Sequence, residues 1–313
     1  MGTRDESRRL SPTEGTVTMR INKCIELLEQ GQPFYHTPTP ELSYDAGREM
    51  AQTWADMVLI DFEHHHFDIG GLYQFMRGLK DGGPTPSGHP TPAVVTSLPH
   101  SAYSPEEVQY NAWQMRHALT TGIHGLLHTH VRNPEATKWF VAACRYPFQT
   151  IGSDIIPEGI RGGGGQRQPA AIWGVDPKEY VQIADPWPMN PNGELMLGLK
   201  IEDRHCLPFA EQTAAVPGIA FAEWGPGDMG MSFGDPDAHD PPYPDFMDNA
   251  LNIVKKALEN NGIAFYAAWQ DEEMNNEQQV DQLIDGLGCK MIGALTRDIA
   301  DYGRAKTGRT MPV

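Results

Sequence analysis

Residues 195–228 read LMLGLKIEDRHCLPFAEQTAAVPGIAFAEWGPGD, and this segment indicates the fold class. An apolar run over 195–202 is followed by a helical pattern over 204–215 and a second apolar run over 219–225. Both apolar runs are short, and both lead into acidic turns. A strand, a helix and a second strand in this order form the repeating unit of parallel α/β folds.

The same alternation recurs along most of the chain. Candidate strands lie at 33–36, 57–63, 93–98, 125–131, 195–202, 219–225, 264–269 and 290–295. Helical patterns lie at 45–55, 69–79, 105–120, 134–144, 204–215, 244–260, 276–287 and 297–304. Eight strands with intervening helices predict an α/β fold, and a (β/α)8 TIM barrel suits eight better than an open sheet.

The predicted barrel leaves two stretches without strands or helices. Residues 1–18 are polar, and we expect a flexible N-terminal extension there. Residues 19–313 are expected to form a single barrel domain. Within it, the stretch at about 146–192 is rich in Gly and Pro and predicts a long loop excursion. Loops of this length in compact domains usually serve a function or move.

Composition excludes several classes of partner. The 313 residues include 24 basic and 41 acidic side chains, a formal net charge of −17. Nucleic acids and anionic membrane surfaces both select basic patches, so neither is an expected partner. The chain contains no apolar run of 18 residues, and its N-terminus has no apolar signal core. The four cysteines are far apart and predict reduced thiols, so we expect a cytoplasmic protein.

Two carboxylates follow neighbouring predicted strands, where a barrel places its active site. Glu202 and Asp228 together provide the oxygen ligands typical of a Mg²⁺ or Mn²⁺ site, although both could be solvated loop acids. Lys200 lies two residues before Glu202, so both side chains share a strand face. Lys200 could polarise a substrate carbonyl, form a Schiff base, or pair with a buried carboxylate.

Histidines and glycines complete the candidate site. Three consecutive histidines at 64–66 cannot all bind one ion on a strand, so one functional histidine is the better interpretation. His128 and His130 share a strand face and could line the site, although a core position is commoner for each. The turn at 225–228 follows a strand directly, and its amides could hold a carboxylate beside the metal.

Four sequence blocks resemble the HpcH/HpaI family of metal-dependent class II pyruvate aldolases, which is related to the citrate lyase β-subunit. Residues 60–64, IDFEH, are similar to the family's I-D-x-E-H block. Residues 122–131 and 143–147 resemble its fourth strand and A-x-R-Y-P-P segment, and 160–162 fit its G-x-R-G loop. Residues 195–234 are similar to L-M-x-x-x-Q-I-E followed by G-P-x-D-L-S-x-S-x-G. The resemblance covers about residues 20–305 and again implies a TIM barrel.

The resemblance implies roles for individual residues. Glu202 and Asp228 match the metal ligands, which in the family hold Mg²⁺, Mn²⁺, Co²⁺ or another divalent cation. His64 matches the active-site histidine, with Asp61 beside it. Two further sets of residues are expected at the site. The expected substrate contacts are Gly225, Pro226, Gly227, Asp228 and Ser97. The expected supporting residues are Glu63, His128 and His130.

The family chemistry implies an aldehyde-lyase that cleaves or forms 4-hydroxy-2-oxo acids through a pyruvate enolate. The metal stabilises the enolate as a Lewis acid, and a base moves a proton through water. The implied partners are a small oxo-acid substrate and further copies of the chain, commonly in hexamers.

Three departures from the family pattern leave alternatives open. Ser97 replaces an arginine that polarises the carbonyl, Lys200 replaces a glutamine, and Thr120 replaces an aspartate that assists the histidine. A cation lost at one strand and gained at another could be a relocated charge, with Lys200 acting in catalysis. It could also indicate related enolate chemistry, such as decarboxylation or a citrate-synthase-like condensation. A third interpretation is a protein that binds a metal–oxo-acid complex without turnover.

Overall fold

Eight parallel strands close into a barrel in the computed structural model, which describes residues 19–313 except 40 and 295. The barrel strands are β1 (Phe34–Thr37), β2 (Met57–Ile60), β3 (Ala93–Ser101), β4 (Gly125–Thr129), β6 (Leu195–Lys200), β7 (Phe221–Trp224), β8 (Ala264–Ala267) and β9 (Met291–Gly293). Each pairs with its neighbours in order, and pairings between β4 and β6 and between β1 and β9 complete the ring. The (β/α)8 barrel expected from the sequence is confirmed.

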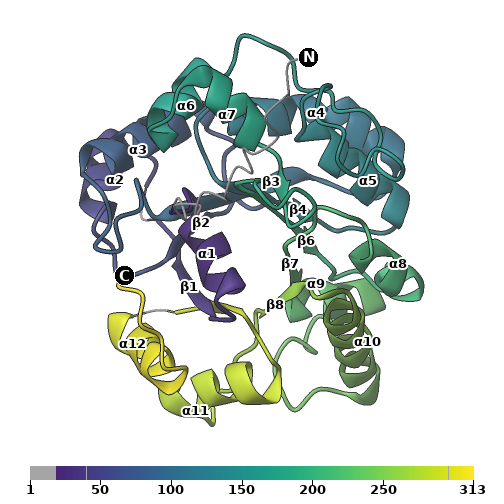
Figure 1. The fold of residues 1–313 in the computed structure, drawn as a ribbon. Coiled ribbons are helices and arrows are strands. Elements are labelled where there is room, and N and C mark those ends of the chain that lie inside the picture. Colours follow the sequence, from purple (N-terminus) through teal and green to yellow (C-terminus); the bar gives the residue numbers. More distant parts are fainter. Residues whose placement is uncertain (1–18, 40, 295) are drawn as a thin grey trace, which may run out of the picture.

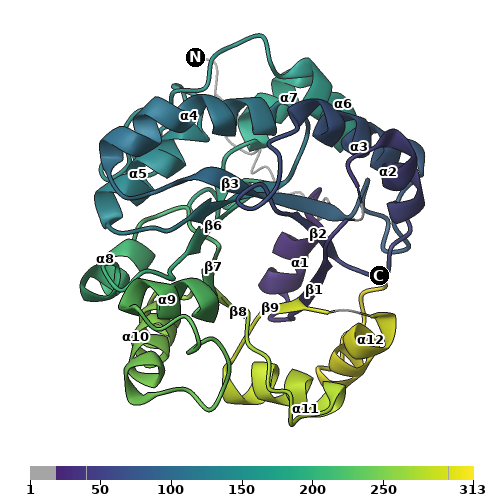
Figure 2. The same ribbon diagram turned by 180° about the vertical axis from the view of Figure 1, so that it is seen from behind.

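Most of the helices surround the ring, whereas α1 lies across it, as both end views show (Figures 1 and 2). They are α1 (Lys23–Glu29), α2 (Tyr44–Met50), α3 (Ile69–Asp81), α4 (Pro105–Leu119), α5 (Pro134–Ala143), α6 (Arg167–Trp173), α7 (Pro177–Ile183), α8 (Ala210–Ala214), α9 (Pro226–Phe233), α10 (Asp245–Asn261), α11 (Asn276–Asp281) and α12 (Arg297–Lys306). Two short turns, η1 (Leu207–Phe209) and η2 (Gln282–Gly286), adjoin α8 and α11. Helix α4 shows how the local sequence starts a helix. Its first residue is Pro105, and Oγ of the preceding Ser104 accepts a hydrogen bond from the backbone amide of Glu107.

The stretch at 146–192 differs from the expected loop. It contains α6, α7 and the two-residue strand β5 (Pro186–Trp187), which pairs with β6. Trp173 and Tyr180 in this stretch are buried, and the Trp173 indole donates to the carbonyl of Gly122 at 2.9 Å. Arg145 and Asp185 form a buried pair at 2.7 Å that fixes the end of the segment. The Gly and Pro content of 146–192 predicts a loop, but burial of its apolar side chains gives the segment a regular structure. The extension expected at 1–18 lies outside the described residues.

The barrel interior is closed at the end where the strands begin. Helix α1 lies across the ring of strands (Figure 1), and Cys24, Ile25 and Leu27 join the interior apolar cluster. Beside them, Asp56 is fully buried and accepts two 2.7 Å hydrogen bonds from Arg309, while Lys23 lies 3.3 Å away. These contacts leave the opposite end, where the strands finish, as the open end of the barrel.

All four cysteines lie within the described residues, buried and without a disulfide. Among residues 19–313, apart from the two omitted positions, no helix has the length and apolar character needed to cross a bilayer.

Candidate active site

Titratable side chains gather where the barrel strands end. A pocket of about 270 Å³ opens there and is lined by residues that follow β3, β4, β6 and β7. They are Tyr103, His130, Arg132, Glu202, Asp203, His205, Asp228, Met231 and Ser232. The pocket therefore lies at the end of the barrel where (β/α)8 enzymes carry their active sites.

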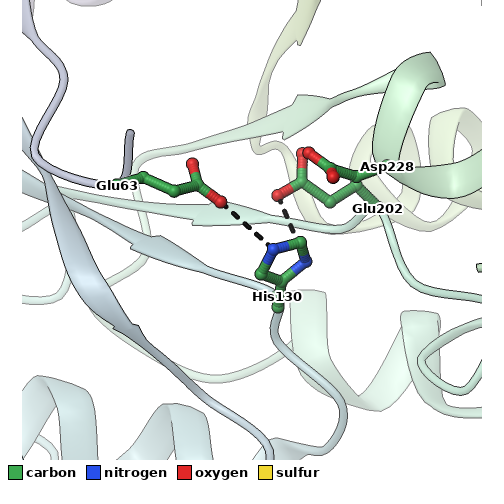
Figure 3. Close-up of side chains that lie close together, drawn as sticks. All are labelled: Glu63, His130, Glu202 and Asp228. Carbon is green, nitrogen blue, oxygen red and sulfur yellow. Dashed lines mark ion pairs between the residues drawn. The ribbon is translucent and has the colours of Figure 1, made fainter. Parts of the chain in front are cut away.

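Glu202 and Asp228 lie side by side at this end, as the sequence predicts (Figure 3). Glu202 is 1% exposed, and neither carboxylate oxygen accepts a hydrogen bond from any residue in the described part of the chain. Gly225 leaves room for the carboxylate, because a Cβ at that position would lie 2.2 Å from Oε2. Burial raises the pKa of the Glu202 carboxyl well above its ordinary value. A buried carboxylate without donors is costly, and a bound cation would satisfy it.

Four ligand atoms, one each from Glu63, His130, Glu202 and Asp228, lie within 4.8 Å of one another. Figure 3 shows the His130 imidazole between the carboxylates of Glu63 and Glu202. Three carboxylates and an imidazole are a donor set that suits a divalent cation. The residues present therefore fit the cation that the resemblance implies.

Lys200 shares this space. Its ammonium donates to Glu63 Oε2 at 2.6 Å and lies 3.5 Å from Glu202 Oε1. Burial alone would lower the pKa of Lys200, but the carboxylates of Glu223, Glu202 and Glu63 raise it, so the side chain stays charged. Strand alternation correctly indicates that Lys200 and Glu202 face the same space. It does not indicate that Glu63 already pairs with the ammonium.

His128 and His130 do not line the same space, contrary to the sequence expectation. Strand β4 ends at Thr129, and His130 adopts a left-handed backbone with φ of +46°. Alternation therefore fails after Thr129. His128 is fully buried, and its Nε2 lies 3.0 Å from Nε2 of His100, away from the carboxylates. It is a core residue, whereas His130 lies among the carboxylates.

His64 lies at the rim of the site, with a side chain that is 59% exposed. Its Nδ1 lies 2.8 Å from Asp61 Oδ2, and this contact raises the pKa of the imidazole. Burial opposes ionisation of Asp61, yet hydrogen bonds from His64, Ser97 and two backbone amides lower its pKa to about 2. Asp61 is therefore a fixed anion that orients His64.

Ser97 supports the turn at 61–63, which follows β2, and it is not among the residues that line the pocket. Its hydroxyl donates to Asp61 Oδ1 at 2.9 Å and accepts the amides of Phe62 and Glu63 at 2.8 and 3.1 Å. The substrate contact expected of Ser97 is thus replaced by a structural role, because the turn after β2 folds back over β3.

Residues not selected from the sequence also belong to the site. Glu223 pairs in register with Lys200, and burial raises the pKa of its carboxyl to about 7. Arg132 contacts Asp203 at 2.8 Å, and its guanidinium carbon lies 3.7 Å from the centroid of the Tyr103 ring. Both residues lie at or just after strand ends. Charge at these positions is the sequence signal that could have identified them.

Comparison with known proteins agrees with this geometry. A hydroxypyruvate/pyruvate aldolase of Sagittula stellata is 27% identical over 194 residues, which cover 62% of this chain and 63% of that protein. One of Deinococcus radiodurans is 31% identical over 179 residues, 57% of this chain and 52% of that protein. The chain is therefore similar to curated pyruvate aldolases. It thus matches a little over half the length of each of these two relatives.

Solved structures share the fold over most of the chain. A HpcH/HpaI aldolase/citrate lyase family protein of Burkholderia cenocepacia superposes with a TM-score of 0.66. It is 20% identical and covers 92% of this chain and 97% of its own. The likeness confirms the barrel. No family model matches the chain.

Proposed function

We propose that this protein is a divalent-metal-dependent carbon–carbon lyase that cleaves or forms 4-hydroxy-2-oxo acids through a pyruvate enolate. The observation that carries the proposal is the buried Glu202 carboxylate beside Asp228, whose oxygens accept no hydrogen bond from any of the described residues. The relatives named above are aldolases, which supports the reaction class.

Glu202 and Asp228 would hold the cation, for which we propose Mg²⁺ or Mn²⁺, with Co²⁺ as an alternative. A divalent cation held there would supply a Lewis acid for the keto oxygen of a 2-oxo acid. Gly225 keeps the Glu202 oxygens accessible, because any larger residue would collide with them.

The turn from Gly225 to Asp228 would hold the substrate carboxylate. Helix α9 begins at Pro226, so the amides of Gly227 and Asp228 lie in its first turn, where helices leave amide groups without intrahelical acceptors. A Cβ at Gly227 would meet nothing within 4 Å, so the space beside its backbone is open. Lys200 adds a positive charge beside Glu202, and we propose that it stabilises the negative charge that develops on the substrate oxygen.

His64 would move the proton. Asp61 holds Nδ1 at 2.8 Å, and the side chain is exposed, so Nε2 can exchange a proton with substrate or water. An oriented and accessible histidine favours turnover over binding without reaction.

A related enolate reaction, such as decarboxylation or a citrate-synthase-like condensation, is the second candidate. Two departures from the family pattern favour it. Ser97 supplies no positive charge where the family has an arginine. Thr120 stands where the family has an aspartate, and its hydroxyl donates to the carbonyl of His117 at 2.7 Å at the end of α4. Thr120 therefore makes its contact within its own helix and offers no carboxylate to the histidine.

A panel of 4-hydroxy-2-oxo acids tests the reaction. Pyruvate release is measured with lactate dehydrogenase and NADH, with and without EDTA. We expect at least one member to give pyruvate, EDTA to stop its release, and added Mg²⁺ or Mn²⁺ to restore it. Glu202→Gln should abolish activity and metal binding while the circular dichroism spectrum stays unchanged. Release of carbon dioxide without an aldehyde would favour the second candidate.

The substrate, the assembly and the location of the protein are also part of the proposal. We propose a small oxo acid as substrate, assembly into a homo-oligomer, specifically a hexamer, and a cytoplasmic location. Light scattering measures the assembly directly, and a monomer mass that does not change with concentration would contradict it.

A further inference from the structure

His130 has an unusual backbone. Among the residues that the structure describes, it alone has a positive φ without being glycine. Such conformations are strained and cluster at functional sites, where the surroundings hold them in place. The turn moves the imidazole out of the alternation of β4 and into the space between Glu63 and Glu202.

The two ring nitrogens face different carboxylates. Nε2 lies 3.1 Å from Glu63 Oε1, whereas Nδ1 lies 3.6 Å from Glu202 Oε1. A proton on Nε2 faces the Glu63 carboxylate favourably, whereas a lone pair there would face its negative charge. Nδ1 then carries the lone pair of the ring. The distance of 3.6 Å is too long for a hydrogen bond and leaves Nδ1 free for another partner.

Glu63 is itself held in position. Its other oxygen, Oε2, accepts the Lys200 ammonium at 2.6 Å. A histidine that binds a metal through one nitrogen usually directs the other toward a carboxylate, which fixes the ring and increases its basicity. The chain from Lys200 through Glu63 to His130 has this arrangement and ends at the Glu202–Asp228 pair.

We infer that Nδ1 of His130 is a third protein ligand of the cation held by Glu202 and Asp228, with Glu63 as its positioning residue. This inference rests on the proposed cation site and goes beyond it in ligand set and in cation class. Imidazole nitrogen suits Co²⁺, Zn²⁺ and similar transition metals, whereas Mg²⁺ prefers oxygen ligands alone. The site therefore selects a transition metal over Mg²⁺.

Two nearby histidines offer matched comparisons. His205 lines the same pocket but is exposed and lies outside the group of four ligand residues. His64 has its Nδ1 engaged by Asp61 and also lies outside that group. Replacing either with glutamine should leave the ligand set unchanged.

The experiment combines calorimetry with pulsed electron paramagnetic resonance on the full chain, stripped of metal and reloaded. His130→Asn is the main variant because asparagine, like histidine, tolerates a positive φ. We expect it to lower Co²⁺ affinity about 10–100-fold and Mg²⁺ affinity less than about threefold, since only the transition metal benefits from the imidazole. With Mn²⁺ bound, electron spin-echo modulation from an imidazole ¹⁴N should be present in the wild type, His205→Gln and His64→Gln, and absent in His130→Asn.

The outcomes separate this inference from the proposed function. Mn²⁺ binding without ¹⁴N modulation in the wild type would overturn the His130 ligand and leave the carboxylate site intact. Modulation that disappears only in His64→Gln would also overturn it. If no cation binds to the wild type, both the inference and the cation site are wrong. Because the wild-type spectrum and the two glutamine variants decide these points, the test does not depend on the folding of His130→Asn.

Discussion

Lys200 Nζ lies 2.6 Å from Glu63 Oε2, although 137 positions separate the two residues. The contact joins the end of β6 to the turn after β2 across the open end of the barrel. A lysine so close to a carboxylate could be only a structural counter-ion. Its second contact, 3.5 Å from Glu202 Oε1, places the same charge beside the proposed cation site and makes a catalytic role testable.

Lys200→Met should lower kcat by a factor on the order of 10²–10³, because it removes one charge that stabilises the developing oxyanion. Metal affinity, measured by calorimetry, should be largely retained. Wild-type kcat in this variant would show that Lys200 acts only as a counter-ion. A pyruvate adduct trapped on Lys200 by borohydride would instead indicate a Schiff base and contradict the metal mechanism.

Ser97→Ala should destabilise the protein by about 1–3 kcal/mol, because it leaves Asp61 and two amides without the Ser97 hydroxyl. Thr96 is the matched control, since its buried hydroxyl has no partner among the described residues. Thr96→Val should change stability by less than about 1 kcal/mol, because the hydroxyl that it removes makes no hydrogen bond. Urea unfolding of both variants checks the pair, and equal losses would contradict the supporting role of Ser97.

Asp56 should make stability depend on pH at the acidic end. Burial alone would raise the pKa of its carboxyl, but Arg309, Lys23 and Arg304 lower it below its ordinary value. A group whose pKa is lower in the folded state stabilises the fold above its unfolded pKa, about 4. That stabilisation is lost as the pH falls through the lower folded value.

Asp56→Asn should therefore flatten this dependence. It should lower the free energy of unfolding by about 3–5 kcal/mol at pH 7, because the buried basic side chains lose their counter-ion. The exposed Asp237→Asn is the control and should follow the wild type. Urea midpoints between pH 3 and 7 give the comparison. A wild-type slope in Asp56→Asn would show that other carboxyls dominate acid unfolding.

Sequence periodicity predicts the barrel and part of the site. Each of the eight expected strands overlaps a barrel strand, because short apolar runs between helical patterns have few other solutions. Alternation also places Lys200 and Glu202 in one space, as observed. These successes concern residues on or next to regular strands.

Residues beyond the strand ends could not be placed in this way. His130 leaves the strand through a left-handed turn, and no periodic pattern contains that angle. Ser97 lies on β3, yet its role depends on how the turn at 61–63 folds over it. The order of 146–192 comes from buried Trp173 and Tyr180, whose contacts are distant in sequence.

A cation at Glu202 and Asp228 should allow pyruvate to lose a methyl proton, whatever aldehyde the enzyme uses. The direct test is deuterium incorporation into pyruvate in D₂O, followed by mass spectrometry after the protein is removed. We predict incorporation by the metal-loaded wild type, none after EDTA treatment, and none with Glu202→Gln. Exchange that continues in EDTA, or a metal-loaded wild type that incorporates no deuterium, would contradict the account.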